Sequence, residues 1–388
     1  MSTNNKEATL LTGGTGFLGS YIGAELLRKG EPVYFLIRKD TANTPIERLH
    51  KILDWHGINQ DMRKNSLLIK GELGAPGLGM DPGESRQAVQ SISRIIHCAS
   101  NTSFSERKRK EVWKTNVSDL KGLMDFAAKT RCRRFIYLSS VYSAGCRIKP
   151  CKEEFPTGNK FFNCYEESKS TGENYLKRRC REEKIPLIII RPSIVYGDSR
   201  TGKTLRFNAL YYPIKAALLL KKIYKEDILL HGGKKAAAAG VKIKSDGKLL
   251  FPLRIAVKKK AGVNLVPVDF FVRAFFAVLE NIKSEGIFHI VNPTLTKIED
   301  IIDFASRQFK FEGIRACKSE DFNKESRNLL ERLFEQYIDA YSPYLRDTRI
   351  FLAEKTTPIL EESGIICPEF NETIFRRCMS YAESHGWS

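Results

Sequence analysis

The sequence predicts an α/β fold: a Rossmann-type doubly wound parallel sheet with a smaller, mainly helical C-terminal lobe. Short apolar runs alternate with stretches of helical spacing through about residue 200, which indicates strands joined by crossover helices. The runs are apolar throughout, as parallel strands are when helices cover both faces. A glycine-rich turn follows the first run, at the edge where such sheets bind ligands.

Seven runs have the length and composition of buried strands. Polar turns and helical stretches separate them, so we expect consecutive strands to lie parallel in one sheet. The predicted strands are residues 8–11, 32–37, 66–71, 94–98, 134–138, 186–190 and 287–292.

The segment TLLTGGTGFLG at residues 9–19 ends the first predicted strand and precedes the helical stretch YIGAELLRKG. Gly13 permits a tight turn, Gly16 lets main-chain N–H groups approach a phosphate, and Gly19 allows close helix–strand packing. The helix N-terminus adds partial positive charge. A purely structural turn is the alternative. We expect a dinucleotide pyrophosphate to be held by Thr12, Gly13, Thr15, Gly16, Phe17, Leu18 and Gly19.

The second predicted strand ends in Arg38 and Lys39, where an NAD-selective enzyme would carry a carboxylate for the ribose 2′-hydroxyl. A basic pair suits a 2′-phosphate, so the sequence favours NADPH. Asp40, directly after the pair, argues in the opposite direction, and a solvated basic strand end is the alternative interpretation.

The composition is that of a soluble globular protein. The chain has 388 residues, 42% of them hydrophobic, and no apolar signal segment or membrane-spanning stretch is apparent. Nine scattered cysteines without a CxxC pair resemble free thiols of a reducing compartment, not a disulfide framework or a zinc site. We therefore expect a cytoplasmic protein without a metal.

The chain is strongly basic, with a formal net charge of +19. This charge favours an acidic partner, such as coenzyme A, an acidic carrier protein or an anionic membrane surface. Nucleic acid is not expected, because the clusters do not alternate with aromatics and match no nucleic-acid module. A solvated basic surface is the alternative. The clusters lie at residues 107–110, 131–134, 177–179 and 258–260.

A second motif, YEESK at residues 165–169, follows the strand that ends in Ser139 and Ser140. A spacing of four places Tyr165 and Lys169 on one face of a helix, where the cation is expected to lower the pKa of the phenol. Ser140 would hydrogen-bond a substrate oxygen, Tyr165 would donate a proton, and Lys169 would hold the nicotinamide ribose. A chance surface pair is the alternative for Tyr165 and Lys169 alone.

Together, TGGTGFLG, the strand-end serines, YEESK and RPSIVYGDSRTG resemble the extended short-chain dehydrogenase/reductases. Within them, the chain looks most like the branch of thioester reductases and fatty acyl-CoA reductases. The resemblance implies that Asn116 is a fourth polar catalytic residue. It also implies cofactor contacts near the adenine and the nicotinamide, from Glu72, Leu73, Pro192, Ser193 and Val195. Glu72 stands where the family usually has aspartate.

The resemblance also suggests two lobes, an NADP-binding domain at residues 1–205 plus 262–295 and a substrate-binding lobe at residues 206–261 plus 296–388. In the second lobe, helices are expected within 206–230, 319–341 and 372–384. Thr296 and Glu299 have the spacing of a capping box before IEDIIDFASRQF. The low-complexity stretch HGGKKAAAAG, residues 231–240, is expected to be a loop.

The activity that the resemblance implies is NADPH-dependent reduction of an acyl thioester, carried by coenzyme A or by an acyl carrier protein, to an aldehyde or further to an alcohol. Lys258–Lys260 are expected to receive the phosphates of coenzyme A or the acidic face of an acyl carrier protein. The alternatives are an extended reductase or epimerase acting on a nucleotide sugar, steroid or other free carbonyl, and a non-catalytic protein that keeps the fold. A homodimer is compatible with the resemblance.

Overall fold

The computed structural model describes residues 8–146, 150–155, 160–282 and 285–387. The chain forms two compact units. The first comprises Met1–Ser193, Phe270–Ile290 and Phe351–Ile366, and the second comprises Ile194–Asp269, Val291–Ile350 and Cys367–Ser388. The lobe boundaries expected from the sequence stay a prediction.

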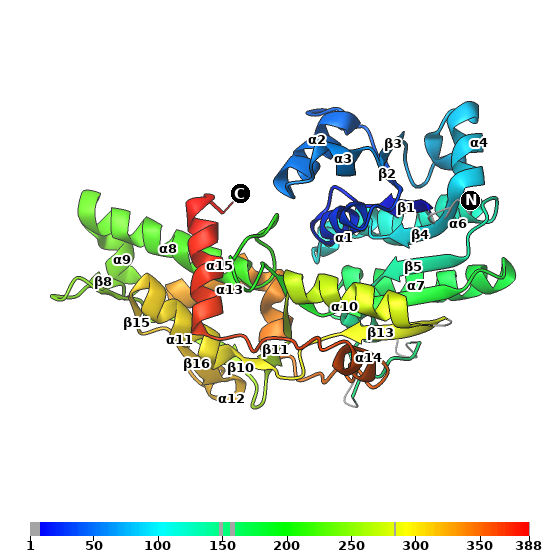
Figure 1. Cartoon of the computed structure of the whole chain (residues 1–388). Helices are drawn as coiled ribbons and strands as arrows, with labels where there is room; N and C mark the ends of the chain where they lie inside the picture. Colours follow the sequence, from blue (N-terminus) through cyan, green and yellow to red (C-terminus); the bar gives the residue numbers. More distant parts are fainter. Residues whose placement is uncertain (1–7, 147–149, 156–159, 283–284, 388) are drawn as a thin grey trace. The chain divides into compact units, whose positions relative to one another are not determined.

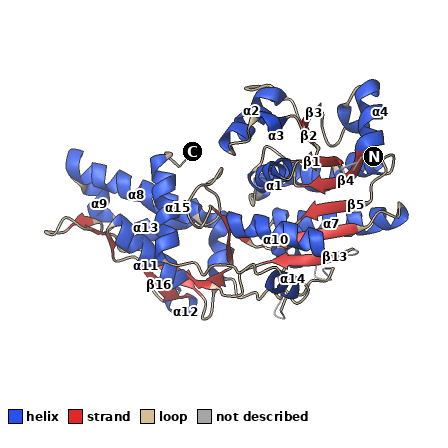
Figure 2. Cartoon of the chain, viewed as in Figure 1, coloured by secondary structure: helices blue, strands red, loops and turns tan. Residues whose placement is uncertain are grey.

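The first unit contains the predicted doubly wound sheet, with seven parallel strands in the order β13-β6-β5-β4-β1-β2-β3. The direction of winding reverses between β1 and β4, which is where ligands bind in such sheets. Figure 2 shows the strands of this sheet with helices around them. The strands are β1 (Ala8–Thr12), β2 (Val33–Ile37), β3 (Ser66–Lys70), β4 (Ile92–His97), β5 (Arg134–Leu138), β6 (Leu187–Pro192) and β13 (Gly286–Ile290).

Helices cover both faces of the sheet because its strands are apolar on both sides. Leu10 of β1 belongs to a core cluster that includes residues of α6 (Leu120–Ala127) and α7 (Cys164–Glu182). The next residue, Leu11, points the other way, toward α1 (Phe17–Arg28), where a Cβ on Gly23 would lie 2.9 Å from it. Figure 1 shows these helices around the sheet, with α10 (Val268–Asn281).

Shorter helices complete the first unit. The α2 helix begins with a capping box between Thr44 and Glu47 and with Pro45 in its first turn, which satisfies N–H groups that the helix itself cannot pair. The remaining elements are α2 (Pro45–Trp55), α3 (Gln60–Arg63), η1 (Pro76–Gly79), α4 (Pro82–Ser91), η2 (Glu106–Lys108), α5 (Arg109–Trp113), the π-helical turn η3 (Lys114–Ser118), η4 (Val141–Ala144) and α14 (Thr356–Glu362).

The second unit is mainly helical, with several two- or three-stranded sheets. Its core includes Tyr211, Phe251 and Phe375, all almost fully buried. The elements are β7 (Ile194–Tyr196), α8 (Tyr211–Leu230), α9 (Lys234–Ala238), β8 (Lys242–Ile243), β9 (Leu249–Leu250), β10 (Arg254–Val257), β11 (Gly262–Val263), β12 (Leu265–Pro267), β14 (Thr296–Lys297), α11 (Ile298–Phe309), β15 (Phe311–Glu312), β16 (Arg315–Lys318), α12 (Ser319–Phe322), α13 (Leu329–Ile338), η5 (Asp339–Arg346) and α15 (Glu372–Ser384).

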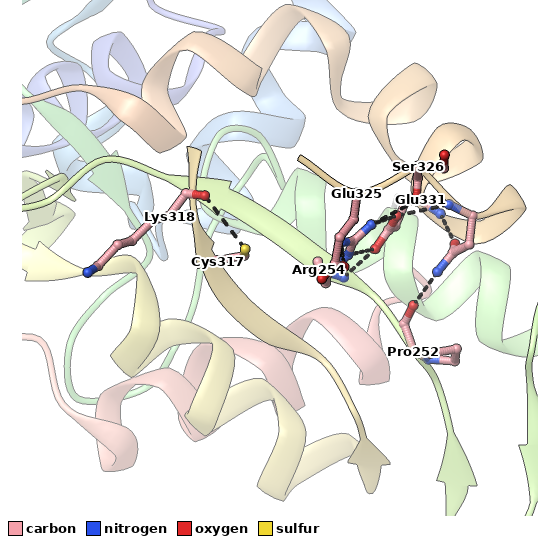
Figure 3. A network of polar contacts seen from close by, with 8 residues as sticks. Pro252, Arg254, Cys317, Lys318, Glu325, Ser326 and Glu331 are labelled. Carbon is pink, nitrogen blue, oxygen red and sulfur yellow. Dashed lines mark hydrogen bonds and ion pairs between the residues drawn. The ribbon is translucent and has the colours of Figure 1, made fainter. Parts of the chain in front are cut away.

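A charged network fixes the start of β10 to the start of α13 (Figure 3). The Arg254 guanidinium donates to both carboxylate oxygens of the fully buried Glu331, at 2.6 and 2.9 Å, and also pairs with Glu325. Asn328 caps α13 and donates to the carbonyl of Pro252 at 2.8 Å. Two segments far apart in the sequence are thereby joined by charge-assisted hydrogen bonds.

Two local expectations for the second unit are wrong. Thr296 does not cap α11, because Lys297 occupies the N-cap position and Thr296 pairs with Val263 in a short antiparallel ladder. The stretch at 231–240 is not all loop, since Lys234–Ala238 form α9. Alanine has the highest helix propensity, and Asp227 accepts a hydrogen bond from the Ala236 N–H at 2.9 Å.

The other expected helices of this unit are present, with one interruption. The segment 319–341 is divided into α12, α13 and the start of η5, because Asn328 begins a new helix with a capping box to Glu331. The 372–384 helix has the expected bounds. Among the described residues, no helix is both long enough and apolar enough to cross a bilayer.

Candidate active site

The glycine turn has the backbone geometry that a dinucleotide site needs. Gly13 has φ +70°, and a Cβ there would lie 2.5 Å from the N atom of Ala99 at the end of β4. A Cβ on Gly19 would lie 2.3 Å from the carbonyl oxygen of Gly13. Gly16 is the N-cap of α1, and Phe17 and Leu18 begin that helix. The turn thus presents main-chain N–H groups of a twelve-residue helix at the carboxyl edge of the sheet.

Thr12 has a structural function within the turn. Its fully buried hydroxyl lies 2.7 Å from Nδ1 of His97 and accepts from the N–H of Ala99 at 3.2 Å. Burial, with a smaller contribution from the Lys169 ammonium, lowers the pKa of His97 to about 3. The imidazole is therefore neutral, and Thr12 ties the ends of β1 and β4 together beneath the expected pyrophosphate position.

Arg38 and Lys39 follow β2 and are exposed at the same edge. The carboxylate of Asp40 accepts from the N–H of Ala42 and the hydroxyl of Thr41, so it shapes its own turn. Sequence reasoning missed Arg48. This α2 residue donates to the Arg38 carbonyl at 2.9 Å and to the Thr15 hydroxyl at 3.1 Å.

Arg48 therefore joins the basic strand end to the glycine turn. The sequence shows that Arg48 follows Arg38 by ten residues, but it does not show that the two lie together. Their contact depends on where α2 packs after β2. A guanidinium at this point can offer a fork to a phosphate.

Ser140, Tyr165 and Lys169 lie together at the carboxyl end of β5. Tyr165 and Lys169 are one turn apart on α7, and the Ser140 hydroxyl is hydrogen-bonded to the Tyr165 phenol. The buried Lys169 ammonium donates to the carbonyl of Leu138 at 2.9 Å and lies over the Tyr137 ring. The site therefore contains two neighbouring hydroxyls, those of Ser140 and Tyr165, and a buried ammonium one helical turn from the tyrosine.

The expectation that Lys169 lowers the pKa of Tyr165 is wrong. Burial raises the pKa of Tyr165 to about 12, and the bond to Ser140 only partly opposes this change. Burial lowers the pKa of Lys169 to about 8, against the attraction of Cys98 and Glu173. Tyr165 consequently keeps its proton at neutral pH and can donate a hydrogen bond to a carbonyl oxygen.

Asn116 lies in the π-helical turn between α5 and α6 and is buried. Its amide oxygen accepts from Ser100 and from the N–H of Asn101, and its amide nitrogen donates to Ser168 at 2.9 Å. Ser168 immediately precedes Lys169. The amide thus links the loop after β4 to the helix that carries Tyr165 and Lys169.

The remaining predicted cofactor residues are distributed over both units. Glu72 follows β3 and pairs with Lys114 at 3.2 Å, while Leu73 packs on the core. Pro192 ends β6, and the N–H of Ser193 donates to the carbonyl of Ile290 at 3.1 Å. Val195 belongs to β7 in the second unit, where it pairs with Val266.

Glu173 is a second residue that sequence reasoning missed. It is fully buried on α7 and accepts from Ser139 at 2.5 Å, from Ser143 at 2.8 Å and from Arg191 through two bonds. Arg191 also contacts His289, whose pKa burial lowers to about 3. Glu173 follows Lys169 by four residues, as Lys169 follows Tyr165, so the sequence already indicated that all three lie on one face of the helix. Its carboxylate connects α7 to the ends of β5 and β6.

Among the residues that the structure describes, no group of three or more His, Cys, Asp or Glu side chains is placed to hold a metal ion.

The fold and the Ser–Tyr–Lys constellation define an extended short-chain dehydrogenase/reductase. Within this class, the chain belongs to the male sterility protein family, whose NAD-binding model matches residues 11–275. Relatives include a component of the linear gramicidin synthase of Brevibacillus parabrevis, 23% identical over 97% of this chain but only 7% of that protein. Human fatty acyl-CoA reductase 1 is 32% identical over 37% of this chain and 30% of its own length. The chain thus spans less than a third of these relatives.

Solved structures with the same fold include the terminal R domain from the myxalamid pathway, with a TM-score of 0.77 and 22% identity over 100% of this chain and 92% of that one. A thiolation-reductase di-domain from an archaeal non-ribosomal peptide synthetase has a TM-score of 0.72 at 17% identity, over 98% and 76% of the two chains. UDP-glucuronic acid 4-epimerase from Bacillus cereus has a TM-score of 0.65 at 16% identity, over 97% and 99%.

Proposed function

We propose that this protein is an NADPH-dependent reductase of acyl thioesters, which forms an aldehyde and can reduce it further to an alcohol. The observation that carries the proposal is the meeting of Ser140, Tyr165 and Lys169 at the carboxyl edge of a sheet whose first turn suits a dinucleotide. The names of the relatives, a fatty acyl-CoA reductase and synthetase reductase domains, support the thioester substrate.

The residues present fit a nicotinamide dinucleotide. The glycine turn and the N-terminus of α1 would hold the pyrophosphate, and Arg38, Lys39 and Arg48 would hold a 2′-phosphate. Lys169 would hold the nicotinamide ribose, and Asn116 would keep Lys169's helix in place through Ser168. When bound, NADPH supplies hydride.

The chain's own residues stabilise the charge that develops on the thioester oxygen. The hydroxyls of Ser140 and Tyr165 donate hydrogen bonds to that oxygen, and Tyr165 delivers its proton as the carbonyl is reduced. The resulting hemithioacetal expels the thiol and leaves the aldehyde. Since the pKa of Tyr165 is about 12, the proton is present at any physiological pH.

The test follows NADPH absorbance with acyl-CoA thioesters of several chain lengths, free aldehydes and nucleotide sugars. We expect turnover with thioesters, and Tyr165→Phe should lose at least 100-fold in kcat while it still binds NADPH. Turnover with nucleotide sugars alone, or with none of the substrates, would overturn the proposal. Parallel assays with NADH test the cofactor preference.

A second candidate is an extended reductase or epimerase acting on a nucleotide sugar, a steroid or another free carbonyl. The fold shared with UDP-glucuronic acid 4-epimerase favours it, and the same triad could serve it. The substrate panel separates the two candidates. Whichever substrate is correct, the carrier protein, a contact with an anionic membrane, a homodimer and a cytoplasmic location remain proposals.

A further inference from the structure

The loop after β4 lies directly against the first turn of α7. The ring of Phe104 is 5.5 Å from the ring of Tyr165 between centroids. Two residues further on, the carboxylate of Glu106 accepts from the N–H of Cys164 at 2.8 Å. Cys164 is the first residue of α7 and precedes Tyr165. The segment 104–110 is therefore held beside the catalytic tyrosine.

This segment contains the basic cluster Arg107, Lys108, Arg109 and Lys110, which has two kinds of member. Arg109 is used to hold the segment in place, because it donates to Glu106 at 2.7 Å and to Glu167 at 2.6 Å. These bonds raise its pKa further. Its charge is thus balanced within the protein, and it fastens the segment to α7 at a second point.

The other three cations are exposed, and none of them forms an ion pair with another described residue. Arg107 and Lys108 belong to η2, and Lys110 belongs to α5. Two acidic residues flank them in sequence: Glu106, which already pairs with Arg109, and the exposed Glu111. The rim, as we call Arg107, Lys108 and Lys110, consequently keeps an excess of positive charge on the segment that is held beside Tyr165.

We propose that this rim binds the phosphate groups of a coenzyme A thioester during its reduction, an inference that rests on the proposed function. Coenzyme A carries a diphosphate and a 3′-phosphate at the end of a flexible pantetheine arm. If the thioester carbonyl lies at Tyr165, the phosphates lie away from the catalytic hydroxyls, at the periphery of the site. One guanidinium fork and two ammonium groups match this small set of anionic groups.

Coenzyme A is a better match than the cofactor's own 2′-phosphate. Arg38 directly follows β2 and accepts a bond from Arg48 of α2, whereas the rim follows β4 on a segment that Arg109 fastens to α7. The expectation from the sequence placed the coenzyme A phosphates, or an acidic carrier protein, at Lys258–Lys260, which belong to the second unit. The rim and Lys258–Lys260 can be distinguished in one experiment, because removing the charges of each should affect the KM for acyl-CoA only if that cluster binds coenzyme A.

The experiment compares three triple variants in the full chain. The first is Arg107→Gln/Lys108→Gln/Lys110→Gln, and the second is Lys258→Gln/Lys259→Gln/Lys260→Gln. The control, Lys129→Gln/Arg131→Gln/Lys184→Gln, removes three exposed charges from turns that precede β5 and β6, at the opposite edge of the sheet. Each is assayed with an acyl-CoA and with the N-acetylcysteamine thioester of the same acyl group, which has no phosphate.

We expect the rim variant to raise KM for the acyl-CoA roughly tenfold at low salt, as three exposed charge contacts allow. KM for the cysteamine thioester and for NADPH should change less than about twofold, and the effect on acyl-CoA should shrink as salt is added. The control variant should match the wild type. An equal rise in KM for both thioesters would overturn the inference, as would a rise confined to the Lys258–Lys260 variant.

Direct binding of unacylated coenzyme A, measured by titration calorimetry, separates this inference from the proposed function. Suppose that the rim variant binds coenzyme A more weakly than the wild type does, and that the wild type reduces no thioester. This result would support the rim as a coenzyme A site and overturn the proposed activity. Unchanged coenzyme A affinity overturns the rim even if thioesters are reduced. A loss seen only with a carrier-protein thioester also overturns it and indicates an acidic protein partner.

Discussion

The ammonium of Lys169 donates a 2.9 Å hydrogen bond to the carbonyl oxygen of Leu138, the last residue of β5. The bond ties the helix that carries Tyr165 to the strand end that leads into Ser140. It also leaves the cation in a buried position, where its charge is costly and its pKa is lowered to about 8. The position of Lys169 therefore affects both the geometry and the pH response of the site.

We expect the kcat/KM of reduction to be constant below about pH 8 and to fall roughly tenfold per pH unit above it. Lys169 has a lowered pKa of about 8, so its charged form is present below that pH and is lost as the pH rises. The measurement is a pH profile of kcat/KM between about pH 6 and about pH 10, at saturating NADPH. A flat profile through this range would show that the ammonium charge is not required.

Glu173→Gln should shift this limb to lower pH, because the Glu173 charge raises the pKa of Lys169. The variant should also unfold at a lower temperature, since Arg191 loses the carboxylate of a fully buried ion pair. Glu182→Gln, on the same helix but exposed and paired with Arg178, is the matched control and should change neither property. A lower Tm with an unchanged limb would assign Glu173 to stability alone.

Ser140→Ala should lower kcat by roughly 100- to 1,000-fold, the usual effect of removing a donor to a developing oxyanion. The hydrogen bond from Ser140 lowers the pKa of Tyr165, so its loss should raise that pKa further. Ultraviolet titration of the tyrosine, with Tyr165→Phe as the reference, measures the change. The Kd for NADPH should stay at the wild-type value, and a rise in Kd equal to the loss in kcat would contradict the assignment.

Arg48→Gln should raise the Kd for NADPH about tenfold and leave the Kd for NADH nearly unchanged, because a guanidinium–phosphate contact exists only with the 2′-phosphate. Fluorescence titration with both nucleotides measures the ratio. Arg63→Gln is the control, since this arginine pairs with Asp54 outside the turn. Equal weakening of both nucleotides would mean that Arg48 only supports the turn through Thr15.

Glu331→Gln should destabilise the second unit by about 3 kcal/mol, because it removes the carboxylate that neutralises Arg254 in a largely buried position. Urea unfolding of the full chain measures the change. Lys324→Gln removes an exposed pair with Asp321 and should cost less than about 1 kcal/mol. Similar losses for the two variants would contradict a dominant contribution from the buried pair.

Much of the sheet could be predicted from the sequence because its strands are apolar and separated by helical stretches. The seven observed strands overlap the seven expected runs. The four-residue spacing of Tyr165 and Lys169 likewise required only a helix, and α7 provides it. In both cases the signal is local, since residues near in sequence determine it.

Three features that the sequence did not reveal are decided by distant segments. Thr296 has the spacing of a cap, yet pairing with Val263 takes it into a strand. The pKa of Tyr165 depends on how deeply the phenol is buried, which the sequence does not state, and burial outweighs the bond to Ser140. Arg48 reaches Thr15 only because of where α2 lies. Long-range packing sets all three.

The first unit is built from three separate parts of the chain. Residues near the start of the last part, Phe351–Ile366, bind the buried carboxylate of Glu153, which belongs to the first part. Glu153 accepts from the N–H of Lys355 at 2.5 Å and from the hydroxyl of Thr356 at 2.5 Å. During synthesis the sheet can form early, but the partners of Glu153 at Lys355 and Thr356 leave the ribosome only about two hundred residues after Glu153 itself. In a nascent chain stalled before residue 351, this carboxylate would keep the bond from the His289 N–H but lack its two partners at Lys355 and Thr356. It would then be exposed to chaperones, although every strand of the sheet had already been translated.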